Sequence, residues 1–383
     1  MTKIDSKKRS ECSGCTACAS ICPHKAISMQ SDALGFLYPI IDNTKCTDCG
    51  LCARICPFHS KYDRSENYET PIIYGMRVRD HKELLKSQSG GAFFIFSEQI
   101  LQHGGIIYGA GLSDQFKVIH KRATTRSERD ALRLSKYVQS DIRGVFHLVR
   151  TDLQNGLEVL FCGTPCQVAG LKAYLGKKQF TKKLITIDLV CHCVSSPLVW
   201  QEYLLWLEKK YNNKIESVTF RNKAAGWSSS IEQYKFSNGR IVNRHTFNSL
   251  FYAHYIVRES CSNCPFTNLK RIGDISIGDF WGWKKYHQEF ADDKGISLVF
   301  INSPKGEVIF KSAKPDILSI RSNMNECLQP QLQEPIQLSP NYQKFIQALT
   351  TKGFEYAARR YGDIGWKYKI RSYFSPIKRL IIK

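Results

Sequence analysis

Short apolar runs and amphipathic stretches follow one another along the middle of the chain. The apolar runs at 105–111, 158–161 and 183–190 have the length and hydrophobicity of buried strands. The stretches 165–175 and 197–211 each begin with proline and continue with helical periodicity, which is typical of helices with proline in their first turn. This alternation of strands and helices predicts an α/β core.

A different pattern follows between residues 215 and 250. Two further segments with strand-like patterning, 231–236 and 240–245, flank Ser237-Asn238-Gly239. Asparagine followed by glycine is the strongest short-range signal for a β-hairpin. We therefore expect an antiparallel section that is inserted into the α/β domain.

The first 60 residues contain an internal repeat of cysteines. Each copy follows C-x2-C-x2-C-x3-C-P, the spacing with which bacterial two-cluster ferredoxins hold [4Fe-4S] clusters. In that spacing, three cysteines of one copy share a cluster with the fourth cysteine of the other copy. The expected ligands of one cluster are Cys12, Cys15, Cys18 and Cys56, and those of the other are Cys46, Cys49, Cys52 and Cys22.

The residues around the cysteines support this crossed arrangement. Pro23 and Pro57 lack an amide hydrogen and disfavour helical geometry in the preceding residue, so each fourth cysteine leaves its loop in an extended turn. Between the copies, 35–42 predicts a short strand that covers the clusters. The alternative is zinc bound by four cysteines at each site. The compressed spacing, used twice and followed by proline each time, favours clusters, and a pair of clusters indicates an electron relay.

The patterns divide the chain into four parts. Residues 1–58 form the two-cluster ferredoxin-type domain, the polar segment 59–71 is a linker that closes with Pro71, 72–330 form the main domain, and 331–383 form a C-terminal tail. The predicted fold class is an α+β ferredoxin-like module followed by an α/β domain with an antiparallel insertion.

The end of the tail has a distinct composition. From Arg359 to Lys383, basic side chains are interleaved with aromatic and aliphatic ones, and Asp363 is the only acid. Such a segment suits peripheral contact with an anionic membrane surface or with an acidic partner. The alternative is a helix that packs on its own domain and exposes a basic face.

The composition indicates the cellular compartment and the kind of partner that we expect. No apolar run approaches the roughly 20 residues needed to cross a bilayer, and the N-terminus lacks the apolar core of a signal peptide, so we expect a cytoplasmic protein. Fifteen cysteines in that reducing compartment indicate metal ligands or redox groups. The net charge of +21 suits a redox carrier such as an acidic ferredoxin or a reductase. Nucleic acid is not expected, because the basic residues are scattered and no DNA-binding motif accompanies them.

Six further cysteines stand where strands are expected to end: Cys162, Cys166, Cys191, Cys193, Cys261 and Cys264. The tips of parallel strands converge in doubly wound sheets, and cofactors bind there. Four of the six would hold a third cluster. The alternative is that several are small buried apolar residues, and Cys327, which stands alone, fits that packing role.

Several motifs in the main domain resemble the beta subunit family of coenzyme F420 hydrogenases and dehydrogenases, in its bacterial form with a fused ferredoxin module. The motifs are Ser87-Gln-Ser-Gly-Gly-Ala-Phe93, Ser135-Lys-Tyr-Val-Gln-Ser140, Gly163-Thr-Pro-Cys-Gln-Val-Ala-Gly-Leu171, Cys191-His192 with Ser-Pro following, Cys261-Ser-Asn-Cys264-Pro-Phe and Asp274-Ile-Ser-Ile-Gly-Asp-Phe-Trp-Gly282. The resemblance implies FAD and a [4Fe-4S] cluster in this domain, with Cys166, Cys191, Cys261 and Cys264 as ligands. Relatives usually read Cys-His-Gly where this chain has Cys193, and Cys162 is also additional, so these two are the substitute ligands.

The residues themselves are compatible with a bound flavin. Ser89-Gly90-Gly91 opens the predicted helix 92–102, and a glycine turn at a helix N-terminus offers free amides to a pyrophosphate, although a plain helix cap looks the same. Thr164 stands in a similar turn after a strand. Further candidates for flavin contacts are Lys136, Gln139 and Ser140, while Trp281 and Trp283 fit either the flavin ring or the core.

Together these features predict an iron-sulfur flavoprotein oxidoreductase that passes electrons between an external carrier, [4Fe-4S] clusters and FAD. Either direction of electron flow is compatible with the motifs. The alternatives are an electron-transfer subunit that docks to a partner enzyme and a binding module in which the metal is structural. The sequence assigns neither catalytic residues nor a substrate, which is an unknown small molecule or protein.

Overall fold

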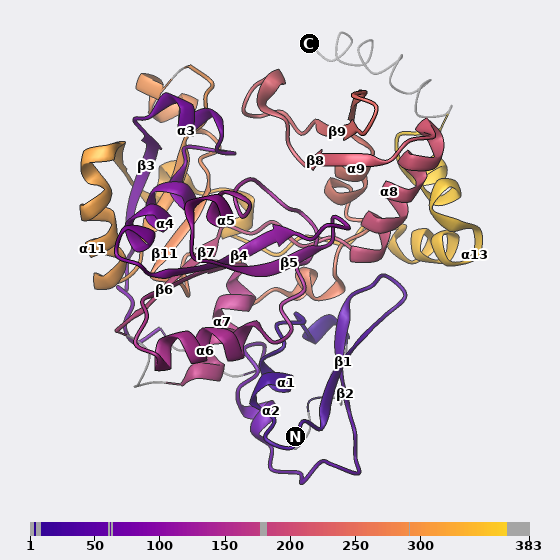
Figure 1. Cartoon of the computed structure of the whole chain (residues 1–383), viewed down its shortest axis with the longest axis horizontal. Helices are drawn as coiled ribbons and strands as arrows, with labels where there is room; N and C mark the ends of the chain where they lie inside the picture. The colour runs from indigo at the N-terminus through magenta and orange to yellow at the C-terminus, as the bar shows by residue number, and fades with distance from the viewer. Residues whose placement is uncertain are drawn as a thin grey trace.

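The computed structural model describes residue 4 and residues 9–59, 62, 64–176, 182–290 and 292–365. Within these residues the strands form sheets of eight, three and two strands. The eight-stranded sheet lies at the centre of the molecule, the N-terminal module lies below it in the view of Figure 1, and the three-stranded sheet lies to its upper right.

The central sheet is mixed. In spatial order, its strands are β13 (Ile317–Ser322), β3 (Ile72–Val78), β12 (Ser297–Ile301), β11 (Ile275–Asp279), β7 (Leu184–Leu189), β6 (Val159–Gly163), β4 (Ile106–Leu112) and β5 (Val118–Ala123). The neighbours β11, β7, β6 and β4 pair in parallel, and antiparallel strands extend the sheet on both sides. The carboxyl ends of β6 and β7 therefore lie at the same edge of the sheet.

Helices cover both faces of this sheet (Figure 1). One face carries α4 (Ala92–Gln102) and α11 (Pro304–Ala313), and the other carries α6 (Val145–Gln154) and α7 (Pro165–Leu175). Successive residues of β6 alternate between the two cores, because neighbouring strand side chains point to opposite faces. The short helices α3 (His81–Leu85) and α5 (Arg126–Asp130) contact β3 and α4, respectively.

The N-terminal module consists of α1 (Ala17–Ile21), the hairpin strands β1 (Ile27–Ser31) and β2 (Leu37–Ile41), and α2 (Leu51–Arg54). Helix α1 contacts α6 and α7 of the main domain. The turn between β1 and β2 is also anchored, since Leu34 and Phe36 are buried in an aromatic core of the main domain. The module is thus packed against the main domain at two places.

The three-stranded sheet is antiparallel and consists of β8 (Ile215–Thr219), β9 (Glu232–Phe236) and β10 (Ile241–Arg244). Three helices share its core: α8 (Pro197–Tyr211), α9 (Thr246–Tyr252) and α13 (Tyr342–Tyr361). That core is aromatic and includes Trp200, Tyr203 and Phe247. The remaining short α-helices are α10 (Trp283–Tyr286) and α12 (Met324–Cys327).

The predicted fold class is confirmed, with a small ferredoxin-like module, a mixed α/β domain and an antiparallel section near residues 215–250. The helices expected at 92–102, 165–175 and 197–211 begin and end at those residues. The domain boundaries remain predictions. Within the predicted linker, the Arg64 Nε donates a hydrogen bond to the Arg271 carbonyl of the main domain.

The C-terminal segment falls into two parts. Helix α13 packs on α8, and Phe345, Ala357 and Ala358 of α13 are fully buried. Residues 366–383, which make up most of the basic segment from Arg359 to Lys383, lie outside the described residues. The contact of this segment with a membrane or a partner therefore stays a prediction. Among the described helices, none has the length and apolar character needed to span a membrane.

Candidate metal and cofactor sites

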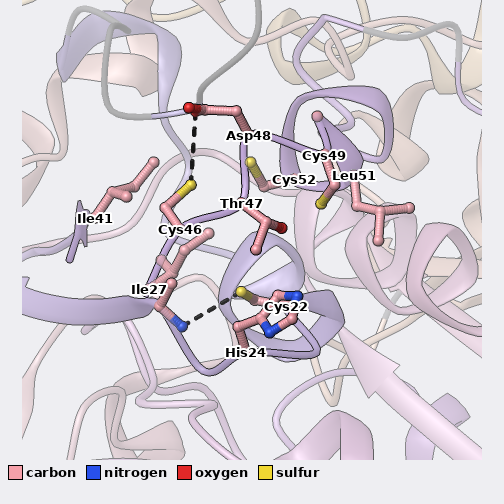
Figure 2. A pocket seen from close by; sticks show the side chains of 12 residues that line it. Cys22, His24, Ile27, Ile41, Cys46, Thr47, Asp48, Cys49, Leu51 and Cys52 are labelled. Atoms are coloured by element: carbon pink, nitrogen blue, oxygen red, sulfur yellow. Dashed lines mark hydrogen bonds between the residues drawn. The ribbon is translucent and has the colours of Figure 1, made fainter. Parts of the chain in front are cut away.

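The cysteines of the second repeat share one hollow with a cysteine of the first repeat. Figure 2 shows the sulfur atoms of Cys22, Cys46, Cys49 and Cys52 around this space. A tight turn places them, because Gly50 has a positive φ of 70° at the start of α2. Cys49 is exposed to solvent. The grouping is the crossed one that the spacing predicts, although the ligand assignment itself remains a prediction.

The complementary set also converges, on the side of the module that faces the main domain. Burial raises the pKa of Cys18 well above its usual value, and the nearby thiols of Cys15, Cys12 and Cys56 raise it further. Burial likewise raises the pKa of Cys15 to about 12. Thiols in such surroundings ionise when a bound metal stabilises the thiolates, so this donor set suits a metal centre.

A third group of thiols lies at the carboxyl edge of the central sheet. Cys166 stands in the first turn of α7, Cys191 follows β7, and the short 3₁₀ helix Glu259–Asn263 and its C-cap bring Cys261 and Cys264 to the same hollow. Burial, followed by the thiols of Cys261, Cys166 and Cys264, raises the pKa of Cys191 well above normal. The structure therefore brings together the four residues that the family resemblance implies.

The remaining cysteines differ in their surroundings. Cys193 lines the hollow of the third group and stands near Cys191 and Cys261. Cys162 is buried in the apolar core between the sheet and α4, and burial raises its pKa to about 12. Cys327 is buried in another apolar cluster, which agrees with a packing role.

The spacing of the thiols can be compared with that of a single zinc site. Four thiolates on one zinc lie about 3.8 Å apart, because each Zn–S bond is about 2.3 Å long. Among the described residues, one group of at least three His, Cys, Asp or Glu side chains has all its ligand atoms within 4.8 Å, and Cys193 is its only cysteine. Within each of the three cysteine groups, no three sulfur atoms all lie within 4.8 Å of one another, so these groups are more open than a zinc site.

A buried arginine connects the first group with the third. The guanidinium of Arg258 donates hydrogen bonds to the carbonyls of Cys12 and Leu37 and to the Gln139 side chain, at 2.7, 2.9 and 2.8 Å. It also lies 4.2 Å from the centre of the Tyr38 ring. The arginine backbone then continues to Cys261, whose amide donates to the Arg258 carbonyl. No sequence pattern signals this role, because the partners come from three distant segments.

Helix α7 makes a second connection between the same two groups. Cys166 lies in its first turn, and Gly170 lies one turn later. A Cβ atom at Gly170 would come within 2.9 Å of the Cys15 Sγ, so only glycine lets the module approach this closely. The first and third thiol groups are thus direct neighbours.

The residues predicted to contact a flavin are distributed over three places. The Ser89 hydroxyl donates to the Ile296 carbonyl, and the Gly90 amide donates to the Ser297 hydroxyl. Gly90 also needs its lack of side chain for packing, because a Cβ there would meet the Met76 carbonyl at 2.1 Å. Gly91 is the N-cap of α4 and has a φ of 87°. This turn is held by the protein itself, and the first amides of α4 follow it.

The other candidates lie closer to the cysteine groups. Gln139 donates to the Ser13 carbonyl of the module, and the Thr164 hydroxyl lies 3.2 Å from the Cys166 Sγ. Ser140 is hydrogen-bonded to His120. Lys136 donates to the Arg133 carbonyl, and burial lowers its pKa to about 7. Their roles in flavin binding remain predictions.

Sequence reasoning missed one residue of the same motif. The side chain of Gln88 has both amide atoms buried, and neither has a hydrogen-bond partner among the described residues. A buried amide without partners is costly, so this position suits contact with a bound ligand. The motif Ser87-Gln-Ser-Gly-Gly contains this signal. By contrast, Trp283 is buried in the core, and Trp281 stacks on Trp227 with 41% of its surface exposed.

Comparisons with known proteins find two matching families and similar solved structures. Residues 11–60 match the 4Fe-4S dicluster domain, and residues 156–324 match the C terminus of the coenzyme F420 hydrogenase/dehydrogenase beta subunit. No curated protein matches the chain. Among solved structures, a chain of the F420-reducing [NiFe] hydrogenase complex from Methanosarcina barkeri, in a xenon derivative, is 19% identical with a TM-score of 0.47. That match covers 77% of this chain and 91% of the other.

Proposed function

Since residues 156–324 match the C terminus of the coenzyme F420 hydrogenase/dehydrogenase beta subunit and residues 11–60 match the 4Fe-4S dicluster domain, we propose that the chain is an iron-sulfur flavoprotein oxidoreductase. It exchanges electrons between an external redox carrier and a substrate by means of three [4Fe-4S] clusters and FAD. Electrons can flow in either direction through the same sites, depending on the potentials of the two partners.

The donor chemistry fits three clusters. Each group offers four thiols that are more widely spaced than the ligands of a single zinc ion, and thiolate sulfur is the ligand that [4Fe-4S] clusters use. The ligands of the first cluster would be Cys12, Cys15, Cys18 and Cys56, and those of the second would be Cys22, Cys46, Cys49 and Cys52. The ligands of the third cluster would be Cys166, Cys191, Cys261 and Cys264. Bound clusters would supply one-electron carriers. The chain itself supplies the thiolates, the burial and the positive charge of Arg258.

The contact at α7 is the observation that carries this proposal. Cys166 of the third group and Gly170, which touches Cys15 of the first group, are one helical turn apart. Electron transfer slows steeply with distance, so direct neighbours make an efficient relay. Cys49, a thiol of the second group, is exposed to solvent, so a carrier can approach that group.

Several features support a flavin near the start of α4. The unpartnered amide of Gln88 and the N-terminal amides of α4 offer hydrogen bonds to a polar ligand. Arg133 links this turn to the candidate Lys136, because its guanidinium donates to the Ser87 hydroxyl and its carbonyl accepts from Lys136. Lys136, with its pKa of about 7, can hold or release a proton at this place. Bound FAD would supply the exchange between one-electron and two-electron chemistry.

The substrate and the partner are open to direct test. The family description names coenzyme F420, so the reduced and oxidised forms of F420 are the first substrates to try. The second candidate function is an electron-transfer subunit without its own substrate, which docks to a partner enzyme. It would hold the same clusters and would co-purify with another protein.

Anaerobic purification of the full chain, followed by iron, sulfide and flavin analysis, tests the proposal. We expect about twelve irons and twelve sulfides per chain, as three cubanes require, and about one flavin. Cys166→Ser and Cys261→Ser should each lower the iron content to about eight. Cys327→Ser is the matched control, because it changes a buried cysteine outside the three groups and should leave about twelve irons.

Other outcomes would overturn parts of the proposal. About eight irons in the unaltered chain would contradict the third cluster. A colourless protein that holds zinc would contradict the clusters altogether. Intact clusters without flavin, together with a tightly associated second protein, would favour the electron-transfer subunit.

A further inference from the structure

Three side chains beside the third cysteine group form a compact cluster of their own. The ligand atoms of His192, Cys193 and His254 all lie within 4.8 Å of one another. The two histidine Nε2 atoms are 2.9 Å apart. His192 and Cys193 follow β7, whereas His254 follows α9, so the fold brings them together from separate segments. We propose that these three residues bind one zinc ion, in addition to any cluster held by the third group.

The Nδ1 atom of each histidine ring already has a hydrogen-bond partner. The His254 Nδ1 donates to the Gln337 carbonyl at 2.7 Å, and the His192 Nδ1 lies 2.9 Å from the Gln331 side-chain nitrogen. With these contacts, the two Nε2 atoms face each other, and one ring nitrogen of each histidine lies within 4.8 Å of the Cys193 Sγ. Histidines that bind metals are usually oriented in this way by a second hydrogen bond at the other ring nitrogen.

The donor set suits zinc. Two imidazole nitrogens and one thiolate are among the ligands that zinc accepts, with bonds of about 2.0 Å to nitrogen and about 2.3 Å to sulfur. Tetrahedral bonds of that length separate two nitrogens by about 3.3 Å, so the rings need to move apart only slightly. Cys193 is buried, with 6% of its surface exposed, and both histidines are half-buried. Three protein ligands leave a fourth position for water or for an oxygen atom of a substrate.

Cys193 is available for the zinc site. The third cysteine group does not need it, because Cys166, Cys191, Cys261 and Cys264 already provide four thiols in the same hollow.

Zinc binding here has a defined proton balance. Without the ion, the His254 Nδ1 carries its hydrogen to the Gln337 carbonyl, so the His192 Nε2–H must donate to the His254 Nε2. On binding, the His192 proton moves to Nδ1, and the Gln331 amide turns so that its oxygen accepts it. The Cys193 thiol loses its proton. One proton is therefore released for each zinc bound, without any change of oxidation state.

Metal analysis of the full chain tests this site. We expect the anaerobically purified protein, after incubation with an equimolar amount of zinc chloride and gel filtration, to hold about one zinc per chain. Cys193→Ser and His254→Asn should each lower the zinc content about fivefold or more and leave iron and sulfide unchanged. Asparagine is chosen because His254 has a φ of 56°, which asparagine tolerates. His103→Gln, which changes an exposed histidine at the end of α4, is the control and should keep the zinc.

The structure of the site can be read directly from zinc X-ray absorption, which should show two nitrogen neighbours and one sulfur neighbour from the protein. The inference is wrong if the unaltered chain takes up no zinc, or if both variants retain it. It is also wrong if Cys193→Ser loses iron, since Cys193 would then be a cluster ligand. If the proposed oxidoreductase function is wrong, the unaltered chain would instead lack iron or flavin.

Discussion

The buried amide of Gln88 allows a sharp test of the flavin site. If a flavin uses this amide, Gln88→Leu should weaken flavin binding about tenfold or more, because a lost hydrogen bond to a buried group costs about 1–3 kcal/mol. Fluorescence titration of deflavinated protein with FAD measures this change. Gln102→Leu, at the exposed end of α4, is the matched control and should bind FAD normally.

A different result is expected if no flavin contacts Gln88. If no ligand reaches Gln88, leucine removes an amide whose two polar atoms lack partners among the described residues. The variant would then be as stable as the unaltered chain or more stable, and its flavin content would not change.

Single residues are predictable where the spacing along the chain alone carries the chemistry. The twelve cysteines proposed as ligands follow from spacing and resemblance, and the structure gathers them in three groups. Gln88 and Arg258 cannot be assigned in this way. The role of Arg258 depends on acceptors at residues 12, 37 and 139, which only the folded chain brings together.

Among the secondary-structure elements, β9 is held in place by a buried carboxylate. Glu232 accepts hydrogen bonds from the hydroxyls of Tyr203 in α8 and Tyr234 in β9 and from the backbone amide of Asn248 in α9. Burial raises the pKa of Glu232 to about 7, although the three hydrogen bonds lower it in part. The packing of α8, α9 and β9 around this residue should therefore depend on pH.

The sign of the pH effect follows from the raised pKa. The folded chain holds the Glu232 proton more tightly than the unfolded chain, whose carboxyl has the usual pKa of 4.5. The stabilisation is complete below the unfolded pKa and is lost as the pH rises through about 7. We expect a loss of about 2 kcal/mol in the free energy of unfolding between about pH 5 and about pH 8. Glu232→Gln should remove this loss.

Denaturant unfolding followed by tryptophan fluorescence, with Trp200 in the same core, measures this effect at both pH values. Glu216→Gln, which changes an exposed glutamate on the neighbouring strand β8, should retain the pH dependence of the unaltered chain. An identical pH dependence in Glu232→Gln would show that another group is responsible.

Elements are predictable where local signals mark their ends. Helix α8 starts after Ser196, whose hydroxyl accepts from the Val199 amide, and Pro197 fits its first turn. The order of strands is not predictable in the same way. Strand β3 pairs with β12 and β13, which lie far later in the chain, and no local pattern encodes such a choice of partner.

At the scale of the whole molecule, the positive charge predicts how a carrier approaches. The net charge is +21, and the module that carries Cys49 also exposes the side chains of Lys25, Lys45 and Arg54. We expect the rate constant for reduction by an acidic ferredoxin to fall about tenfold between about 50 mM and about 500 mM salt, because salt screens this attraction. Stopped-flow absorbance measures the rate.

Charge-reversal variants of this chain can show where the acidic carrier binds. Lys25→Glu should slow reduction at low salt, while Lys311→Glu on α11, in the main domain, should have little effect. A rate that does not change with salt, or equal effects of the two variants, would place the entry point elsewhere.

The division into a module and a main domain is predictable from the cysteine repeat and the change in hydrophobic pattern. Their docking is not, because it depends on small features of distant segments. The carbonyl of Leu34 accepts hydrogen bonds from Ser196 and Leu198 at the start of α8, and Gly170 leaves room for Cys15. None of these contacts follows a recognisable spacing.

The buried Arg258 and the hairpin turn at Phe36 have a consequence for turnover. A ferredoxin domain on a loose tether can deliver electrons by swinging between a donor and an acceptor, and solvent friction then limits its rate. Here such a swing would expose a fully buried phenylalanine and an arginine with several broken hydrogen bonds. The gap between the first and third groups is therefore fixed when the chain folds, and internal electron transfer should not respond to added glycerol or sucrose.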